Sequence, residues 1–420
     1  MPNFSIPLSG LTADSTALSA IANNLANQNT TGYKDVRVLF RDLFYQGLGT
    51  TGAGDPIQVG AGTQVGSMPG TFTQGSVSST GVSTDVAIQG EGFFIVQDNG
   101  VTTYTRAGNF SVDKSNFLVT EEGQQVLGYP AVNGVIDTGA AIAPLQLGAG
   151  SISPPTPTSG VQIQANLNSD AAVNDAFSTP VTIYDSLGST HVLTFTFTKT
   201  AANTWGYSLS IPAAELSPVV PAGGGAPVPQ TGILATGSLS FDGNGILTTP
   251  AADVTAIPIT GFVDGASDLT FDWQLYNGTT PVVTQVAAPS STSSTLQDGS
   301  ASGSLVSFSI GGDGTVTGSF SNGRTAALGQ LALASFGNQQ GLQRVGSNGF
   351  TETLASGQAV AGVAGTGGRG SLAGGALELS NVDIATEFAN LIVAQRAFEA
   401  NAKAITTFDE ITQDTINLKR

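Results

Sequence analysis

The two ends of this chain carry apolar residues at helical spacing, whereas the long middle is dominated by Gly, Ser, Thr and Val. Near the N-terminus, residues 8–27 place Leu11, Leu18 and Leu25 seven positions apart, with Ile21 on the same stripe. This spacing predicts a helix with one narrow apolar face. Such a face must be covered by something, and this requirement constrains the fold more than any other feature of the sequence.

The C-terminal residues 381–418 give the strongest helical prediction in the chain, with Asn381 or Asp383 as the capping residue. Their apolar stripe comprises Ile384, Phe388, Leu391, Phe398, Ile405, Phe408 and Ile411. At about 1.5 Å per residue, this helix would extend roughly 50 Å, which is too long for one small β domain to cover. We therefore expect both terminal stripes to make contacts between copies of the chain. The alternative is a pair of core helices buried within one subunit.

The segments beside the N-terminal helix are less regular. Pro2 and Pro7 are expected to keep the first residues out of a helix. Residues 33–46 fit one helical face, but their aromatic and β-branched side chains would also suit an extended segment. Residues 47–81 are rich in Gly and predict an extended connector with irregular β pairing.

The middle of the chain predicts two β-rich regions. Residues 85–145 contain short strand-like runs separated by turn signals, and residues 304–360 return to the same pattern. Residues 146–160 hold a Pro/Ser/Gly cluster that marks a boundary. Between 161 and 300 lies a second β region, in which Trp205 and Trp273 are expected to anchor the core.

Composition excludes several classes of function. Charged residues make up only 10 % of the chain, and the formal net charge is −17, which argues against binding to nucleic acid or to an anionic membrane. Thiolate catalysis, disulfides and Cys-based metal sites require cysteine, of which the chain has none. No apolar run approaches the roughly 18 residues of a membrane-spanning helix, and the N-terminus lacks the pattern of a cleaved secretory signal.

Catalytic chemistry has little support in the sequence. His191 is the single histidine, so a multi-histidine metal site is excluded, and we interpret it as a polar residue beside a turn. The carboxylates Asp98, Asp242, Asp264 and Asp313 stand where hairpin turns favour Asp, which is a simpler explanation than the acid pair of a glycosidase. We therefore predict no enzyme activity, no catalytic residue, no cofactor and no metal.

Three stretches resemble the bacterial flagellar rod and hook protein family. ANNLANQNTTGYK (22–34) is similar to its N-terminal signature, and residues 84–113, from TDVAIQGEGFFIV to YTRAGNFSVD, are similar to its shared β domain. The stretch LELSNVDIATEFANLIVAQRAFEANAKAITTFDEI (377–411) resembles its C-terminal helix. In the middle, VTIYDSLGSTHVLTFTF resembles the outer domain of hook members, and residues 313–342 resemble their return segment, whereas the distal rod members are much shorter.

The resemblance implies a mainly β, nested multidomain axial protein with terminal α-helices. It implies a coiled-coil inner domain from 1–32 and 378–420, and a connector from 33–83 and 361–377. A split inner β domain from 84–145 and 302–360, and an inserted outer β domain at 146–301, would complete it.

The implied function is that of a structural subunit, which polymerises into a short curved helical tube acting as a universal joint between motor and filament. The implied partners are further copies, rod proteins, the hook cap, the hook–filament junction proteins and the flagellar type III export apparatus. The implied location is the extracellular hook, reached without signal cleavage.

Two other interpretations remain open: a distal rod protein of the same family, and a secreted β-rich adhesin or binding module with a coiled-coil stalk. We further hypothesise that the terminal stripes stay largely disordered in the free subunit and fold on assembly.

Overall fold

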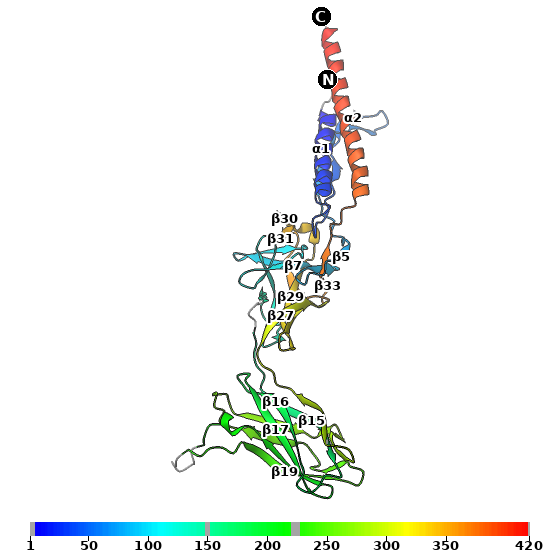
Figure 1. The fold of residues 1–420 in the computed structure, drawn as a ribbon. Coiled ribbons are helices and arrows are strands. Elements are labelled where there is room, and N and C mark those ends of the chain that lie inside the picture. Colours follow the sequence, from blue (N-terminus) through cyan, green and yellow to red (C-terminus); the bar gives the residue numbers. More distant parts are fainter. Residues whose placement is uncertain (1–4, 148–151, 220–226, 419–420) are drawn as a thin grey trace. The chain divides into compact units, whose positions relative to one another are not determined.

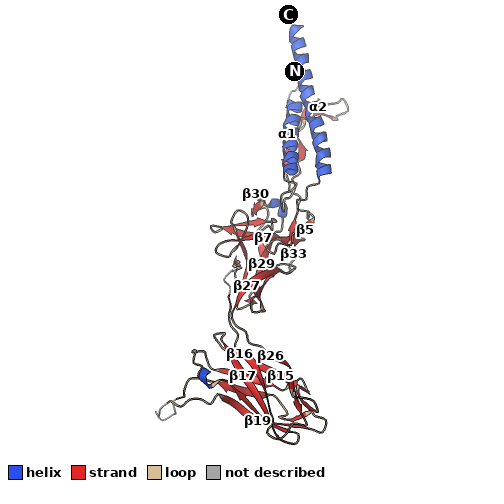
Figure 2. Ribbon diagram, in the orientation of Figure 1, coloured by secondary structure: helices blue, strands red, loops and turns tan. Residues whose placement is uncertain are grey.

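A computed structural model describes residues 5–147, 152–219 and 227–418 of the chain (Figure 1). Its contacts divide the chain into two compact units, which are described separately below. Unit 1 comprises Met1–Ala149, Ser307–Gly318 and Thr325–Arg420, and unit 2 comprises Gly150–Val306 and Ser319–Arg324. Both are built mainly of strands, and the two α-helices belong to unit 1 (Figure 2).

Helices α1 (Ser5–Ala26) and α2 (Ile384–Asn417) lie side by side in unit 1 (Figure 1). Asp383 caps α2, because its side chain accepts hydrogen bonds from the backbone N–H groups of Ala385 and Thr386 at 2.8 and 3.1 Å. Helix α1 begins earlier than predicted, and Pro7 lies within it. A first-turn proline is tolerated there because its missing N–H has no intrahelical partner to lose.

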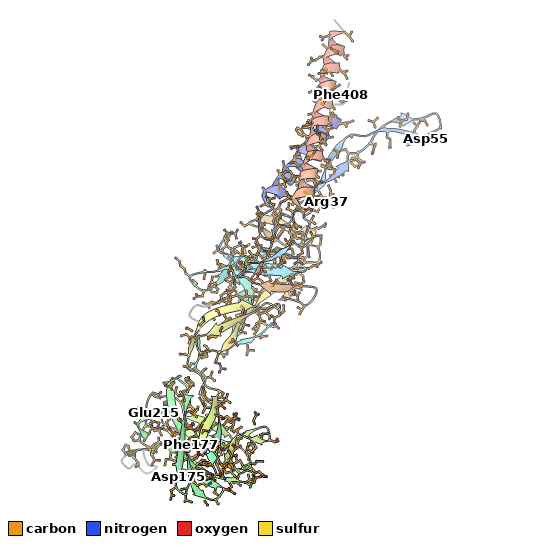
Figure 3. All side chains as sticks on the ribbon, turned by 45° about the vertical axis from the view of Figure 1, so that its right-hand side comes forward. Arg37, Asp55, Asp175, Phe177, Glu215 and Phe408 are labelled. Carbon is orange, nitrogen blue, oxygen red and sulfur yellow. The ribbon has the colours of Figure 1, made fainter. Side chains whose placement is uncertain are left out.

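The connector after α1 is extended, which resolves the ambiguity of residues 33–46 in favour of strands. Strand β1 (Leu39–Asp42) pairs antiparallel with β4 (Thr63–Ser67), and β2 (Gln46–Thr50) pairs with β3 (Pro56–Val59). Asp55 lies at the turn of the second hairpin (Figure 3). Residues 33–67 are thus extended, with two short antiparallel pairs.

The β portion of unit 1 is one large, mostly antiparallel sheet with the strand order β27-β28-β29-β11-β7-β8-β31-β30. Two further antiparallel pairs are β6 with β33 and β5 with β34. Each joins a strand that comes before β7 in the sequence to a strand that comes shortly before α2. Two apolar clusters form its core, one around Phe94 and Leu331 and the other around Phe93 and Phe350. The strands not yet given bounds are β5 (Val77–Ser79), β6 (Val86–Gln89), β7 (Phe93–Asp98), β8 (Val101–Thr105), β9 (Ser111–Val112), β10 (Leu118–Val119), β11 (Gln125–Val132), β12 (Val135–Ile136), β13 (Ala143–Pro144), β27 (Gly303–Ile310), β28 (Thr315–Phe320), β29 (Thr325–Ser335), β30 (Gln343–Gly346), β31 (Gly349–Thr351), β32 (Val360–Val363), β33 (Ser371–Gly374) and β34 (Ala376–Glu378).

Unit 2 is built from two five-stranded sheets that share one apolar core. One sheet has the order β21-β22-β15-β25, with β26 paired to β15, and the other has the order β16-β17-β18-β19-β20. The strands of these two sheets are β15 (Gly160–Asn168), β16 (Ala176–Tyr184), β17 (Thr190–Ala201), β18 (Thr204–Ser210), β19 (Ile233–Phe241), β20 (Leu247–Thr249), β21 (Val254–Ile259), β22 (Leu269–Gln274), β25 (Val283–Val286) and β26 (Ser291–Gln297). Outside the two sheets, unit 2 also contains β14 (Ile152–Ser153) and the antiparallel pair of β23 (Tyr276–Asn277) and β24 (Thr280–Pro281).

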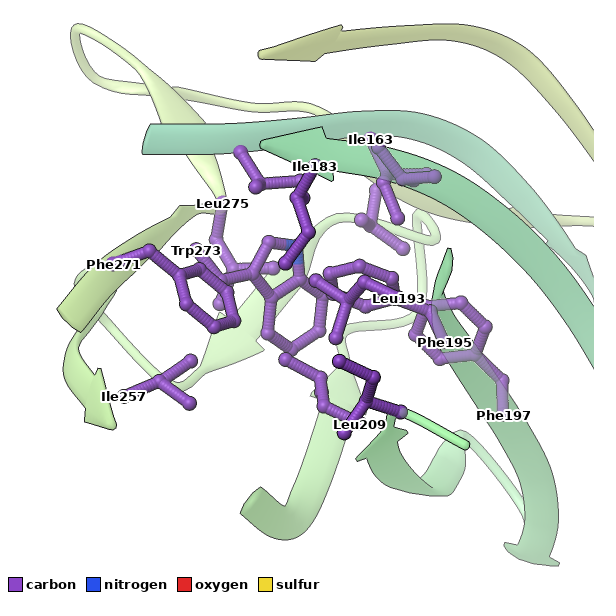
Figure 4. Close-up of a cluster of buried hydrophobic side chains, with 14 of the residues drawn as sticks. Ile163, Ile183, Leu193, Phe195, Phe197, Leu209, Ile257, Phe271, Trp273 and Leu275 are labelled. Atoms are coloured by element: carbon purple, nitrogen blue, oxygen red, sulfur yellow. The ribbon is translucent and has the colours of Figure 1, made fainter. Parts of the chain in front are cut away.

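The core of unit 2 follows from alternating burial along strands such as β15, β16 and β17. In β17, every second side chain is buried, as expected for a strand with one face against a core. Figure 4 shows Trp273 packed among apolar side chains of both sheets, including Ile163, Phe195 and Leu209. Trp205 is also fully buried, so the prediction that both tryptophans anchor this region is confirmed.

Acidic residues at turns hold the backbone as predicted. Asp242 accepts hydrogen bonds from the N–H groups of Asn244 and Ile246, and Asp313 accepts one from Thr315. Asp264 accepts one from Ala266. Neither described helix combines the length and the apolar character needed to cross a membrane.

Candidate functional site: the paired terminal helices

The buried residues of α1 and α2 are mostly small or polar. Ala13 and Ala20 of α1 and Ala394 of α2 are buried. A Cβ at Gly10 would lie only 2.7 Å from Nδ2 of Asn401, so the helices approach closely there. That Asn401 amide also donates a 2.8 Å hydrogen bond to Asp14. The large apolar side chains of the pair are therefore half-buried or exposed, and none is fully buried.

The eleven residues predicted for assembly all lie on this helix pair, and none of them is fully buried within the chain. Half-buried positions are Leu11, Leu18, Ile21, Leu25, Leu391, Phe398, Ile405 and Phe408. Exposed positions are Ile384, Phe388 and Ile411. Phe408 is labelled on α2 in Figure 3. Whether these residues contact other copies stays a prediction.

Several exposed apolar residues on α2 were not predicted from the sequence. Ile392 is 58 % exposed and Val393 is 68 % exposed, and Ile416 lies near the end of the helix with a similar exposure. Ile384, Phe388 and Ile392 recur every four positions, so they share one helix face. This four-residue spacing could have identified Ile392 from the sequence. It was overlooked because Leu391 continued the predicted stripe with three- and four-residue spacing.

An apolar groove of about 350 Å³ lies between the helix pair and the connector. Its apolar lining comprises Ala17, Ala20, Ile21, Val36, Val38, Phe40, Val393, Ala394 and Ala397. Glu387 also lines the groove, is 8 % exposed, and has an Oε2 atom without a hydrogen-bond partner among the described residues. Burial raises the pKa of this carboxyl group.

A buried ion triad joins the segment after α1 and the strand before α2 to the β portion of unit 1. Lys34 Nζ lies 2.6 Å from Glu378 Oε1, and Arg106 Nη1 lies 3.1 Å from Glu378 Oε2. Lys34 follows α1, Arg106 follows β8 and Glu378 ends β34. Lys34 also donates to the carbonyl of Thr73 at 2.7 Å. Burial lowers the pKa of Lys34, and the hydrogen bond and charge of Glu378 oppose this effect.

Two asparagines of the terminal segments bind the connector backbone. Asn24 Nδ2 donates to the Val36 carbonyl, while its Oδ1 accepts from the Val36 N–H, at 2.9 and 3.0 Å. Asn381 accepts a 2.8 Å hydrogen bond from the N–H of Asp35 and donates one to the carbonyl of Thr71. The connector is therefore held from both ends of the chain.

Gly32 is required at the turn after α1. Its φ of +67° lies in the left-handed region, and an added Cβ would lie 2.6 Å from the carbonyl carbon of Arg106. The turn therefore places the backbone of Gly32 directly against Arg106, which follows β8.

Comparison with protein families gives four matches along the chain. Residues 6–34 match the family described as flagella basal body rod protein, and residues 87–169 match the flagellar hook protein FlgE/F/G D1 domain. Residues 153–300 match the flagellar basal body protein FlaE D2 domain, and residues 373–418 match the flagellar basal body rod FlgEFG protein C-terminal family.

Curated relatives match over nearly the whole chain. The flagellar hook protein FlgE of Salmonella typhimurium is 37 % identical over 435 residues, which covers 99 % of this chain and 100 % of that protein. The FlgE of Escherichia coli K12 is 36 % identical over 431 residues with the same coverage. Among solved structures, the flagellar hook protein FlgE2 of Helicobacter pylori aligns with 16 % identity and a TM-score of 0.48, covering 72 % of this chain and 100 % of that chain.

Proposed function

The chain belongs to the flagellar hook protein FlgE family, and we propose that its paired terminal helices polymerise it into the tube of a bacterial flagellar hook. As a member of this family, it is a structural subunit of the flagellum hook. We propose no enzyme activity for it. The observation that carries the assembly proposal is the exposure of large apolar side chains along α2, while the buried positions of the helix pair include no large apolar side chain.

A single chain leaves several large apolar side chains of α2 exposed to water. Phe388 is 52 % exposed, and Ile392 and Val393 are more exposed still. Fully burying one such side chain stabilises a structure by about 1.5–3 kcal/mol. Within one subunit this contribution is largely absent, so neighbours in a polymer would supply it. We propose that the terminal helices become ordered only when neighbouring subunits supply this burial. This requirement would keep free subunits from assembling early.

The groove beside α1 and α2 supports the same proposal. It is lined mostly by apolar side chains and has the shape to receive a side chain from a neighbouring copy. A contact between a groove on one copy and a helix face on the next is of the head-to-tail kind. Repetition of a head-to-tail contact that does not close on itself gives a helical polymer.

We propose that unit 2 provides the contacts that slide when the tube bends. Residues 161–300 contain ten acidic residues and one lysine, Lys199, so few opposite-charge pairs can form between copies. Surfaces of Ser, Thr and Gly side chains exchange hydrogen bonds with water at little cost, because no strong directional pair must break. This property would suit a curved tube that transmits torque from rod to filament while it rotates.

We further propose the partners that a hook subunit requires. These are rod proteins at one end, junction proteins at the filament end, the hook cap during growth and the type III export apparatus before it. Export would proceed without signal cleavage and place the protein in the extracellular hook.

The test is a truncated chain that lacks residues 1–30 and 380–420 but keeps Lys34, Arg106 and Glu378. We expect strand-rich circular dichroism with a cooperative unfolding transition, and a monomer in sedimentation, while the full chain forms tubes visible by electron microscopy. Tubes formed by the folded truncated chain would overturn the proposal, and discrete oligomers of the full chain would favour the stalked binding module instead.

A further inference from the structure

Three carboxylates surround the single histidine in unit 2. His191 opens β17 and is 6 % exposed, and Asp185 follows β16 and is fully buried. The imidazole Nε2 lies 3.1 Å from Asp185 Oδ2 and 4.0 Å from Asp264 Oδ2, while Nδ1 lies 2.7 Å from Glu215 Oε2. Glu215 ends a short 3-10 turn, and Figure 3 marks its position in the unit.

Asp185 and Asp264 each direct one carboxylate oxygen toward Nε2 of His191. Asp185 Oδ1 accepts hydrogen bonds from the N–H groups of Leu187 and Ser189, both at 2.8 Å. Asp264 Oδ1 accepts one from Ala266. Both Oδ1 atoms therefore hold their own turns, and both Oδ2 atoms face the imidazole Nε2. The ligand atoms offered by Asp185, His191 and Asp264 all lie within 4.8 Å of one another.

This arrangement requires a proton or a bound cation beside the imidazole Nε2. Glu215 accepts a hydrogen bond from Nδ1–H, which leaves a neutral imidazole with a lone pair on Nε2. That lone pair would face the Asp185 oxygen, and two acceptors repel each other at hydrogen-bond distance. The basic side chains of the unit are engaged elsewhere, since Lys199 donates to the Ser169 carbonyl and Arg324 to the Asp298 carbonyl. The contact therefore needs a proton between Nε2 and Asp185 Oδ2, or a bound cation.

The geometry fits a small divalent cation. Zinc binds imidazole nitrogen and carboxylate oxygen at about 2.0–2.2 Å, so its ligand atoms lie roughly 3.3 Å apart in a tetrahedron. The observed separations of 3.1 and 4.0 Å bracket this value. A carboxylate on the far imidazole nitrogen is the usual support of a metal-binding histidine, and Glu215 occupies that place. The Asp264 side chain is 32 % exposed, which leaves a side open for entry and for a water ligand.

We propose that Asp185, His191 and Asp264 bind a divalent transition-metal ion of the zinc class, with Glu215 orienting the imidazole. The ion would join the turn after β16, the start of β17 and the turn after β21, and so stabilise unit 2. It would replace the proton on His191 Nε2, so binding should weaken as pH falls. This inference does not depend on the proposed assembly.

The test uses the full-length chain after chelator treatment, titrated with ZnCl₂ at pH 7.5 by calorimetry and by thermal unfolding. We expect one zinc per chain, a raised midpoint of the unit 2 transition and weaker binding at pH 5.5. D264N, which changes a partly exposed side chain, should bind at least about 10-fold more weakly, and E215Q about 10- to 100-fold more weakly. D242N changes a turn aspartate outside the cluster and should bind as the unchanged chain does.

Two results would overturn the proposal. One is the lack of stoichiometric zinc binding at pH 7.5, which would leave the cluster as a protonated histidine held by carboxylates. The other is equal zinc affinity of D264N and the unchanged chain, which would place the ion elsewhere. A visible absorption spectrum of bound Co²⁺ that changes in D264N but not in D242N would support the assignment of these ligands.

Discussion

Lys34 and Glu378 lie 344 positions apart in the sequence, yet their side chains form a fully buried ion pair with an Nζ–Oε1 distance of 2.6 Å. Arg106 completes the triad from the β portion. The pair joins the segment that leaves α1 to the strand that leads into α2. The triad therefore helps to fix the segments next to α1 and α2 to the β portion of unit 1.

We predict that Glu378→Gln strongly destabilises unit 1. Removing this charge leaves Lys34 and Arg106 buried without their counter-ion, and breaking a buried pair costs about 3–5 kcal/mol. Denaturant unfolding of the purified protein measures the effect. The control is Glu399→Gln, because Glu399 is 3.7 Å from Arg396 on an exposed helix face, where a pair contributes about 0–1 kcal/mol. Equal effects of the two changes would contradict the role of the triad.

Gly32→Ala should also destabilise unit 1, through the backbone. The residue has a φ of +67° and no room for a Cβ beside Arg106, and such strain costs on the order of 1–3 kcal/mol. Gly52→Ala is the matched control, since nothing lies within 4 Å of a Cβ placed there. Thermal unfolding should separate the two variants, and identical midpoints would refute this explanation.

The stability of unit 2 should depend on the proton of His191 when metal is chelated. Burial alone would lower the pKa of His191, but hydrogen bonds to Glu215 and Asp185 and their charges outweigh it and raise that pKa. The stabilisation is therefore complete below about pH 6.5, the unfolded value, and is lost as pH rises through the raised folded pKa.

This dependence can be measured by denaturant unfolding in EDTA over a series of pH values above 6. We expect the free energy of unfolding of unit 2 to fall with rising pH in the unchanged chain. His191→Gln should remove that slope. A slope that persists in His191→Gln would show that another group is responsible.

Glu387→Gln should stabilise the helix pair at neutral pH. Burial raises the pKa of this carboxyl group, so its folded form favours the protonated state. The stabilisation is complete below about pH 4.3 and lost as pH rises through the folded pKa, and a permanently neutral Gln avoids this loss. Amide exchange of α1 and α2 at pH 7 should slow in Glu387→Gln but not in the exposed control Glu399→Gln. Faster exchange in Glu387→Gln would contradict this account.

Phe388→Ser should prevent polymerisation while leaving the fold intact. The side chain is 52 % exposed in the subunit, so its loss costs little within one chain but removes apolar area from a contact between copies. Val101→Ser changes a more exposed apolar residue in a hairpin of the β portion and should still polymerise. Light scattering and electron microscopy at matched concentration give the comparison. Normal tubes from Phe388→Ser would rule out this residue as an assembly contact.

Local patterns predicted a large part of the fold. The spacing of apolar residues predicted both helices, residues 161–300 were predicted to be rich in strands, and the tryptophans were correctly placed in the core of that region. These features depend on neighbours within a few positions in the sequence. The start of α1 differed because a proline restricts a helix less in its first turn than in its interior. The finer division into four domains stays a prediction.

The sites that join distant segments could not be predicted from the sequence. Lys34, Arg106 and Glu378 have no shared local pattern, and only the folded chain brings them together. Likewise, Asp264 was predicted only as a turn residue, and Asp185 was given no role; each holds a turn with one oxygen. Their second oxygens meet at His191 because the two turns lie at the same place in unit 2.

The account rests on the terminal apolar faces being covered between subunits rather than within one. Amide hydrogen exchange of α1 and α2, measured by mass spectrometry in dilute monomer and in assembled tubes, tests this directly. We predict rapid exchange of both helices in the monomer and strong protection in the tube, with the strands of unit 2 protected in both. Equal, strong protection of the two helices in the monomer would contradict the account.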